Sequence, residues 1–446
     1  MKRRDFIREV TFIIIPVMLQ QLIVTSVNLI DNLMVGQLGD VSLSGVNAAN
    51  RFYMIESTVI FGIIGACMIF LSQFYGSNNE NKLRETFSFT MVSSFVIALV
   101  FFIIAFFFSK NVIAYFSSNP EVIESGSAYL NIAAFTYLPV AVSFTYGSSM
   151  RSLGETKIPL MVAIIAVVTN TLLNYILIFG HLGFPVLGIK GAAIATLIAR
   201  IVELTTYVLI VKFNNFNFVT KFSELFCFSK TLARKIIIKA MPLVANEFLW
   251  SFGMATLIKF YGTRGVVALT GQSIAQTTSD IFYILFSGMA VATTIMVGQK
   301  LGAGKLEAAK KNAYSLFKFS IALAVIFGVL LFISSFIVPE FYNVSAEAKH
   351  IASSFLKVQG FLFWIYMFVT QCYFIMRAGG DTKSTFIMDS VYMWLVNIPI
   401  VLIVTYFTKA DVIMIYAIAQ STDFVKMLIA YHFLRREQWI NNLAVE

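Results

Sequence analysis

Residues 11–35 read TFIIIPVMLQQLIVTSVNLIDNLMV, and this apolar run decides the fold class of the chain. About 20 apolar residues wound as an α-helix are long enough to cross roughly 30 Å of hydrocarbon. Lys2, Arg3 and Arg4 precede the run, as in a signal peptide, but the run is too long for one and no small-residue cleavage pattern ends it. We therefore expect the run to be the first membrane-spanning helix.

The rest of the 446-residue chain continues the same pattern. Hydrophobic residues make up 58% of it and charged residues only 13%, whereas a soluble domain keeps about 25% charged residues. The apolar runs are too long and too continuous for the alternating strands of an outer-membrane barrel. We expect an all-α membrane protein with about twelve spans, at 11–35, 49–75, 86–108, 127–149, 158–180, 189–213, 234–262, 273–299, 312–337, 350–376, 385–407 and 411–436.

The net charge of +10 indicates topology and does not indicate nucleic-acid binding, because Lys and Arg concentrate in alternate loops. This pattern predicts that both termini lie in the cytoplasm. Low Trp with abundant Ile, Phe, Lys and Asn indicates a bacterial genome, so we expect a multi-pass protein of a bacterial inner membrane. Cys67, Cys227 and Cys372 are widely spaced and predict free thiols.

The two halves of the chain repeat each other. Residues 147–157 read GSSMRSLGETK and residues 373–383 read YFIMRAGGDTK, so that Arg151 and Arg377 correspond at an offset of 226 in the numbering. The same offset links many further pairs, which indicates a duplication. Six spans per half predict two lobes of the same orientation, related by a twofold axis along the membrane normal. We expect lobes at 1–213 and 234–446 and a cytoplasmic linker at 214–233.

Several motifs together resemble the multidrug and toxic compound extrusion (MATE) family. They are MVGQLG at 34–39, SQFYG at 72–76, GQKLG at 298–302, the two RxxG(E/D)TK loops, NTLLNYILIFG at 170–180 and GAAIAT at 191–196. The resemblance covers nearly the whole chain. It implies a two-lobe antiporter that exports small lipophilic or cationic drugs by alternating access, using a gradient of Na⁺ or H⁺.

Four polar residues of the first half are expected at one depth of the membrane. Asp31 lies about 22 Å along its helix from Pro16. Asn170 and Asn174 lie one turn apart on one face of the fifth span, and Thr196 falls at a similar depth in the sixth. Oxygen ligands suit a hard cation such as Na⁺, and a carboxyl group with neutral neighbours can also bind a proton. Both alternatives stay open.

The repeat makes this cluster more informative. At the offset of 226, Asp31, Asn170 and Asn174 correspond to Leu257, Val396 and Ile400, so the polar groups are expected in the first half only. A requirement of the fold would affect both halves, and we therefore interpret the cluster as the cation-coupling site. In the family the position of Asn174 is often Asp, so the resemblance leaves coupling to Asp31.

A second ionisable site is expected on the seventh span, at Asn246 and Glu247, facing substrate or a proton. The alternative is a polar bridge between packed helices. NorM-like members of the family carry Glu and Asp at positions where this chain has Trp250 and Tyr366. The cation site of the NorM-like branch is therefore not present here in the same form. The other candidates for this second site are Glu56, which Arg51 could neutralise, and Asp280. Tyr366 and Trp250 are expected to line its cavity, because aromatic faces attract organic cations.

Other charged residues receive structural interpretations. Arg200 with Glu203, and Asp423 with Lys426, are spaced to pair within single helices. Asp389 is expected near a span end, where charged groups reach the interface. Pro16 and Pro242 correspond in the repeat and are expected either to act as hinges or to fix a curvature.

The alternative function is a lipid-linked oligosaccharide flippase of the same superfamily, which would need several basic residues in its cavity to hold a diphosphate. No phosphate-binding loop, HExxH or GxSxG motif occurs, so we expect neither ATP hydrolysis nor another enzyme activity. We expect a monomer in contact with membrane lipids, with no nucleic-acid partner and no cofactor beyond a bound Na⁺.

Overall fold

The computed structural model describes residues 3–214 and 216–445, and in this part of the chain every regular element is helical. Twelve helices among the described residues are long and apolar enough to cross a membrane, and they begin and end as follows: Arg4–Gly36, Asp40–Gly76, Glu80–Phe107, Pro120–Leu153, Lys157–Phe179, Gly188–Asn214, Lys230–Gly262, Val266–Gly302, Leu306–Ser334, Ala346–Ala378, Thr382–Phe407 and Val412–Arg435. The expected fold class is confirmed. Several helices extend beyond the expected spans, because a helix continues past the point where its sequence becomes polar.

The chain divides into two compact units, Met1–Ile238 and Lys239–Glu446. The segment expected as a linker, 214–233, belongs to the first unit. The long helix α9 begins within the first unit and continues into the second.

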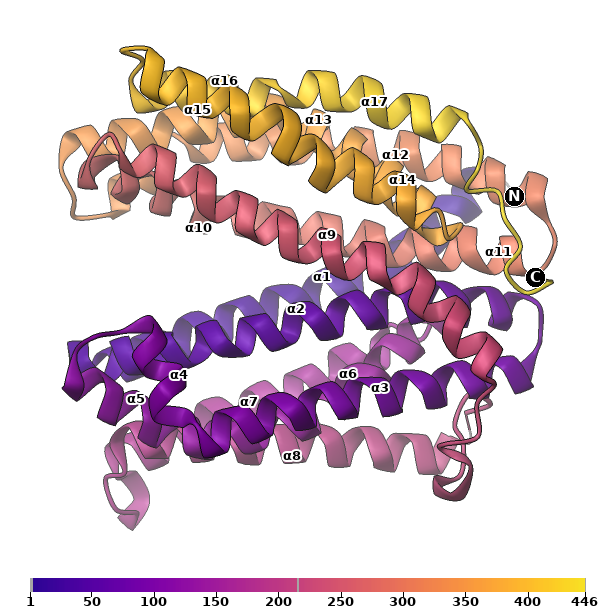
Figure 1. Ribbon diagram of the computed structural model, residues 1–446, viewed down its shortest axis with the longest axis horizontal. Helices are drawn as coiled ribbons and strands as arrows, with labels where there is room; N and C mark the ends of the chain where they lie inside the picture. The colour runs from indigo at the N-terminus through magenta and orange to yellow at the C-terminus, as the bar shows by residue number, and fades with distance from the viewer. Residues whose placement is uncertain (1–2, 215, 446) are drawn as a thin grey trace. The chain divides into compact units, whose positions relative to one another are not determined.

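The first unit is built around α2, which packs against α1, α3, α4, α5 and α6 (Figure 1). Helices α7 and α8 form a closely packed pair, and α1 lies along α7. The helices are α1 (Arg3–Gly36), α2 (Asp40–Gly76), α3 (Glu80–Phe107), α4 (Ser109–Phe116), α5 (Pro120–Ala133), α6 (Tyr137–Leu153), α7 (Lys157–Phe179) and α8 (Gly188–Asn214).

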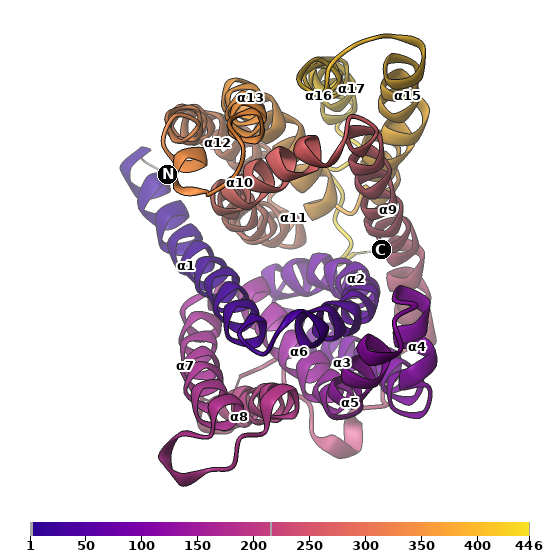
Figure 2. The same ribbon diagram turned by 90° about the vertical axis from the view of Figure 1, so that its left-hand side faces the viewer.

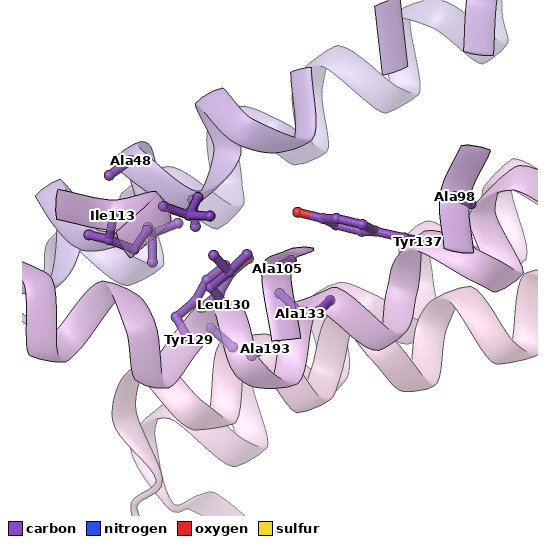
Figure 3. Packing of buried hydrophobic residues seen from close by; sticks show 14 of the residues in the cluster. Ala48, Ala98, Ala105, Ile113, Tyr129, Leu130, Ala133, Tyr137 and Ala193 are labelled. Atoms are coloured by element: carbon purple, nitrogen blue, oxygen red, sulfur yellow. The ribbon is translucent and has the colours of Figure 1, made fainter. Parts of the chain in front are cut away.

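The buried centre of this unit combines alanines with a few large side chains. Figure 3 shows Ala98 and Ala105 of α3 in the same cluster as Leu130 of α5 and Tyr137 of α6. Small side chains let helix backbones approach closely inside a membrane, where packing and not water exclusion holds helices together.

The second unit is built around α13, which packs against α10, α12, α16 and α17; Figure 2 shows α10, α12 and α13 side by side. Two spans contain π-helical turns, η4 in the eighth span and η6 and η7 in the eleventh. The elements are α9 (Lys230–Gly262), α10 (Val266–Thr293), η4 (Thr294–Gly298), α11 (Gln299–Gly302), α12 (Leu306–Ser334), α13 (Ala346–Ala378), α14 (Thr382–Phe386), η6 (Ile387–Val391), η7 (Met393–Asn397), α15 (Ile398–Phe407), α16 (Val412–Ser421) and α17 (Asp423–Arg435).

Candidate functional site

The four polar residues of the first half form one cluster between α1, α7 and α8, which lie side by side in Figure 2. The Asn174 amide donates to Asp31 Oδ1 at 2.7 Å. With its amide nitrogen turned toward Asp31, Asn170 lies 3.0 Å from both carboxylate oxygens. Thr196 Oγ1 lies 3.4 Å from the Asn170 amide. The structure therefore brings together all four residues that the sequence grouped by depth.

The close packing of α7 on α8 places this cluster. A Cβ atom on Gly191 would lie only 2.4 Å from the Leu177 carbonyl oxygen, so only glycine allows the two backbones to come this near. Asn174 precedes Leu177 by about one turn, and Thr196 follows Gly191 by somewhat more than one turn. The contact thus holds Asn174 and Thr196 at neighbouring levels.

The partners of Asp31 are neutral. Arg200, one turn beyond Thr196, pairs instead with Glu203 of its own helix at 2.7 Å, as the spacing predicted. Asp31 makes no ion pair with any side chain that the structure describes. Asn174 Oδ1 is buried and accepts no hydrogen bond from the described residues. A carboxylate beside an open amide oxygen fits a hard cation, and the same carboxylate could take a proton.

The second half contains a cavity of about 540 Å³, which is large enough for a drug-sized molecule. Four acidic and two basic side chains line it, namely Glu247, Asp280, Asp389, Asp423, Arg377 and Lys426. Tyrosines and Trp250 supply much of the remaining wall. Electron-rich ring faces and an excess of acidic groups favour organic cations.

An ion pair lies at the edge of this cavity. Lys426 Nζ of α17 lies 2.6 Å from Asp389 Oδ1 of η6, and the two side chains are 14% and 18% exposed. The Asn246 amide donates to Asp389 Oδ2 at 3.0 Å, and the Ser390 hydroxyl donates to Asn246 Oδ1 at 2.7 Å. The polar groups of α9, η6 and α17 thereby form one network.

The structure gathers most of the residues expected at the second site. Asn246, Glu247, Trp250, Asp280 and Tyr366 all line the cavity. Gln276 donates to Asp280 at 2.7 Å, and Tyr366 donates to Gln420 at 3.1 Å. Asn246 also bridges helices, so the alternative interpretation holds for it as well.

Glu56 is the exception, and the expectation that Arg51 neutralises it is wrong. It belongs to the first unit, whereas every residue that lines the cavity belongs to the second, and it is 1% exposed. Neither carboxylate oxygen has a hydrogen-bond partner among the described residues, so Arg51 does not neutralise it. Arg51 is exposed while Glu56 is buried, because five residues on an α-helix point the two side chains to different faces.

The expectation that the polar groups of the fifth span have no counterpart in the second half also needs correction. The Asn397 amide donates to Thr422 Oγ1 at 2.7 Å, much as Asn170 lies beside Thr196. Thr422 follows Thr196 by the offset of 226, but Asn397 follows Asn170 by 227. The π-helical turns η6 and η7 insert an extra residue into this span, because each π turn is wider than an α turn.

Sequence reasoning missed the role of three charged residues. Asp389 does not sit at a span end; it lines the cavity and binds Lys426. Lys426 donates to Asp389 on another element and not to Asp423 on its own helix. The repeat in the sequence could have indicated the importance of Lys426, because Thr422 and Lys426 correspond to Thr196 and Arg200 at the offset of 226.

Pro16 and Pro242 both lie inside long helices, α1 and α9. Pro16 lines a surface groove of the first unit together with Phe12 and Lys157, and the Lys157 ammonium lies 4.2 Å from the centre of the Phe12 ring. Whether either proline acts as a hinge stays a prediction.

A family model described as MatE matches residues 16–176 and again residues 242–403. The matches cover most of the chain, so this chain belongs to the MatE family, the multidrug and toxic compound extrusion transporters. The starts of the two matches differ by 226 in the numbering and their ends by 227, in agreement with the extra residue in the eleventh span.

Relatives agree over nearly the full length. The chain is 23% identical over 388 residues to a protein of Halalkalibacterium halodurans named probable multidrug resistance protein NorM, covering 87% of this chain and 85% of that one. A crystal structure of a MATE protein in the bent conformation superposes with a TM-score of 0.88 at 17% identity, covering 97% and 95% of the two chains. A MOP superfamily transporter of Pyrococcus furiosus gives a TM-score of 0.86 at 17% identity, covering 96% and 95%. These structural likenesses establish the fold.

Proposed function

We propose that this chain is a secondary active multidrug efflux antiporter of the bacterial cytoplasmic membrane, with both termini in the cytoplasm. It exports organic cations in exchange for H⁺ or Na⁺ by alternating access. Family membership and the relative named as a multidrug resistance protein support the export of drugs. The nature of the coupling ion rests on the residues alone.

The cluster at Asp31 carries the proposal. Its carboxylate lies inside the membrane-spanning part of α1, and the groups that contact it are the neutral amides of Asn170 and Asn174. An unpaired charge in this setting is costly, so the carboxylate gains free energy from a cation that arrives. A cation bound there replaces the amide hydrogen bonds and allows the amide oxygens to turn inward. Binding and helix rearrangement are thereby linked.

The cavity of the second half is the proposed substrate site. Its acidic side chains outnumber its basic ones, and one of the two bases is already paired with Asp389. That balance favours an organic cation over the diphosphate of a lipid-linked oligosaccharide, which would need several free basic groups. Tyr366 and Trp250 offer ring faces for the cation, and Glu247 offers a carboxylate.

Efflux of a fluorescent cation from proteoliposomes tests the proposal. Ethidium efflux is followed under an imposed H⁺ gradient, and separately under an imposed Na⁺ gradient, for the wild type and Asp31→Asn. We expect one gradient to drive efflux and Asp31→Asn to reduce it by more than about tenfold, equivalent to about 1.4 kcal/mol of barrier.

Asp40→Asn is the matched control, because Asp40 is exposed at the start of α2 and should leave efflux unchanged. Unreduced efflux by Asp31→Asn would remove the coupling role of this cluster. Absence of efflux by the wild type under either gradient would overturn the antiporter proposal itself.

A further inference from the structure

Lys426 occupies the place at Asp389 that a bound cation would otherwise take. Its ammonium group lies 2.6 Å from Asp389 Oδ1, while the Asn246 amide holds Oδ2 from the other side. Asp423, one turn earlier on α17, also faces the cavity. The charges of two carboxylates from different elements act on the ammonium, and both it and Asp389 are largely buried.

The corresponding residue of the first half behaves differently. Arg200 corresponds to Lys426 at the offset of 226, and it pairs with Glu203 on its own helix. The position that corresponds to Glu203 in the second half is Ile429, so Lys426 has no acid one turn later on α17, and its ion pair is with Asp389. Asp389 corresponds to Ala163, so the first half in turn has no carboxylate there for Arg200. Each half thus directs its basic side chain to a different acid.

We propose that Lys426 is a tethered counter-ion of Asp389, which keeps Na⁺ out of the second-half cavity and yields its place only to an ammonium group of the organic cation class. On displacement the Lys426 ammonium moves toward Asp423, which keeps the charge of the lysine balanced. The exchangeable inorganic ion is then confined to the cluster at Asp31. This inference deepens the proposed function, since it assigns the substrate site its selectivity, but it concerns binding and requires no transport.

The physical reason is the cost of an unpaired buried charge. Asp389 needs a cation nearby, because leaving one partner of a buried ion pair alone is strongly unfavourable. A covalently attached ammonium supplies that charge at a fixed, high local concentration, which a dissolved ion at ordinary concentrations does not match. Removal of the lysine charge should therefore create a binding site for a free cation that the wild type lacks.

Thermal unfolding of the purified full chain in mild detergent gives the test. The midpoint is measured against methylammonium chloride and, separately, against NaCl, and each variant is compared with the wild type at the same salt concentration. We expect Lys426→Met to be stabilised by methylammonium with an apparent affinity at least about tenfold tighter than the wild type, a difference of about 1.4 kcal/mol. Na⁺ should stabilise this variant in the same way but more weakly.

Three further variants separate this explanation from others. Lys426→Met/Asp389→Asn removes the acceptor and should lose the gain, and Lys426→Arg keeps the charge and should show none. Lys357→Met is the matched control, because Lys357 lies against the Phe336 ring outside the cavity. If Lys426→Met does not fold even when purified in methylammonium, Lys426→Gln serves, since its amide can still bond Asp389 without carrying a charge.

No gain of cation affinity in either neutral variant would overturn the proposal. A gain that persists in Lys426→Met/Asp389→Asn would also overturn it, because the cation would then bind elsewhere. Failure of the antiporter proposal would instead appear as absent efflux with these binding results intact, so the two failures are distinguishable.

Discussion

The two halves of this chain descend from one repeat, yet they balance their membrane-embedded carboxylates in opposite ways. In the first half, Asp31 is held by neutral amides and the nearby Arg200 is paired elsewhere. In the second half, Asp389 is held by Lys426. The first arrangement leaves a negative charge for an exchangeable ion, and the second supplies the positive charge from the chain itself. Duplication of a fold therefore did not duplicate its electrostatics.

The comparison extends to the parts that the halves share. Both keep an Asn beside a Thr between the fifth and sixth spans of the repeat, Asn170 with Thr196 and Asn397 with Thr422. This pair therefore suits a structural link between the last two helices of each half. What distinguishes the halves is the nearby carboxylate: Asp31 of α1 joins the pair in the first half, whereas Asp389 of η6 binds Lys426, one turn beyond Thr422, in the second.

The largest effect on stability is expected from Asp389→Asn. It leaves the Lys426 ammonium largely buried without its closest carboxylate, which costs about 3–5 kcal/mol of unfolding free energy. The nearby Asp423 should bring the loss toward the lower end of this range. Chemical denaturation in mild detergent measures the loss.

The matched substitution in the first half is Glu203→Gln, which breaks the more exposed pair with Arg200. We expect a smaller loss there, because the Arg200 side chain is 36% exposed, against 14% for Lys426, so less of the unpaired charge is enclosed by protein. Equal losses in the two halves would refute the contrast between them. Asp389→Asn/Lys426→Met should recover most of the stability, since it removes both charges.

A smaller loss of stability than that of Asp389→Asn is expected from Gly360→Ala, at the crossing of α12 and α13. A Cβ atom at this position would lie 2.7 Å from the Phe332 nitrogen and 2.8 Å from the Gly328 carbonyl oxygen. Accommodating this Cβ atom should lower the free energy of unfolding by about 1–3 kcal/mol. The corresponding residue of the first half is Ala134, which is buried with its Cβ atom in place. Ala134→Gly should cost only about 0.5–1 kcal/mol, and a reversed order in thermal unfolding would contradict the packing argument.

Asp31→Asn should change stability by about 1 kcal/mol or less, although it is expected to reduce coupled efflux by more than about tenfold. The asparagine retains an oxygen for the Asn174 amide and removes a charge that has no ionic partner among the described residues. Chemical denaturation checks this stability prediction, with the same protein sample that is used in the efflux assay. A loss as large as that of Asp389→Asn would mean that Asp31 has a structural charge partner after all.

The smallest effect is expected from Glu56→Gln. The Glu56 carboxyl group makes no hydrogen bond to the described residues, so replacing it with the glutamine amide removes no hydrogen bond. The free energy of unfolding should therefore stay within about 1 kcal/mol of the wild type. Phe282, the corresponding residue of the second half, indicates that the repeat needs no charge at this position. A marked loss of stability would indicate that Glu56 has an interaction partner. Glu56→Asp would then test whether that interaction requires a charge.

The sequence alone determined the membrane class, the spans, the repeat and the cluster at Asp31. These follow from distances along single helices, where each residue adds a constant rise, so that depth can be counted from the ends of a span. Asp31, Asn170, Asn174 and Thr196 were grouped in this way, and they do lie together.

Only the tertiary structure decided which helices face each other and in which register. It paired Lys426 with Asp389 across two elements, whereas spacing along one helix favoured Asp423. It placed Glu56 in the packed interior of the first unit, and it shifted Asn397 by one residue through the π-helical turns. Depth is a property of one helix, but partner choice depends on the rotation of each helix about its axis, which the packing of all its neighbours sets.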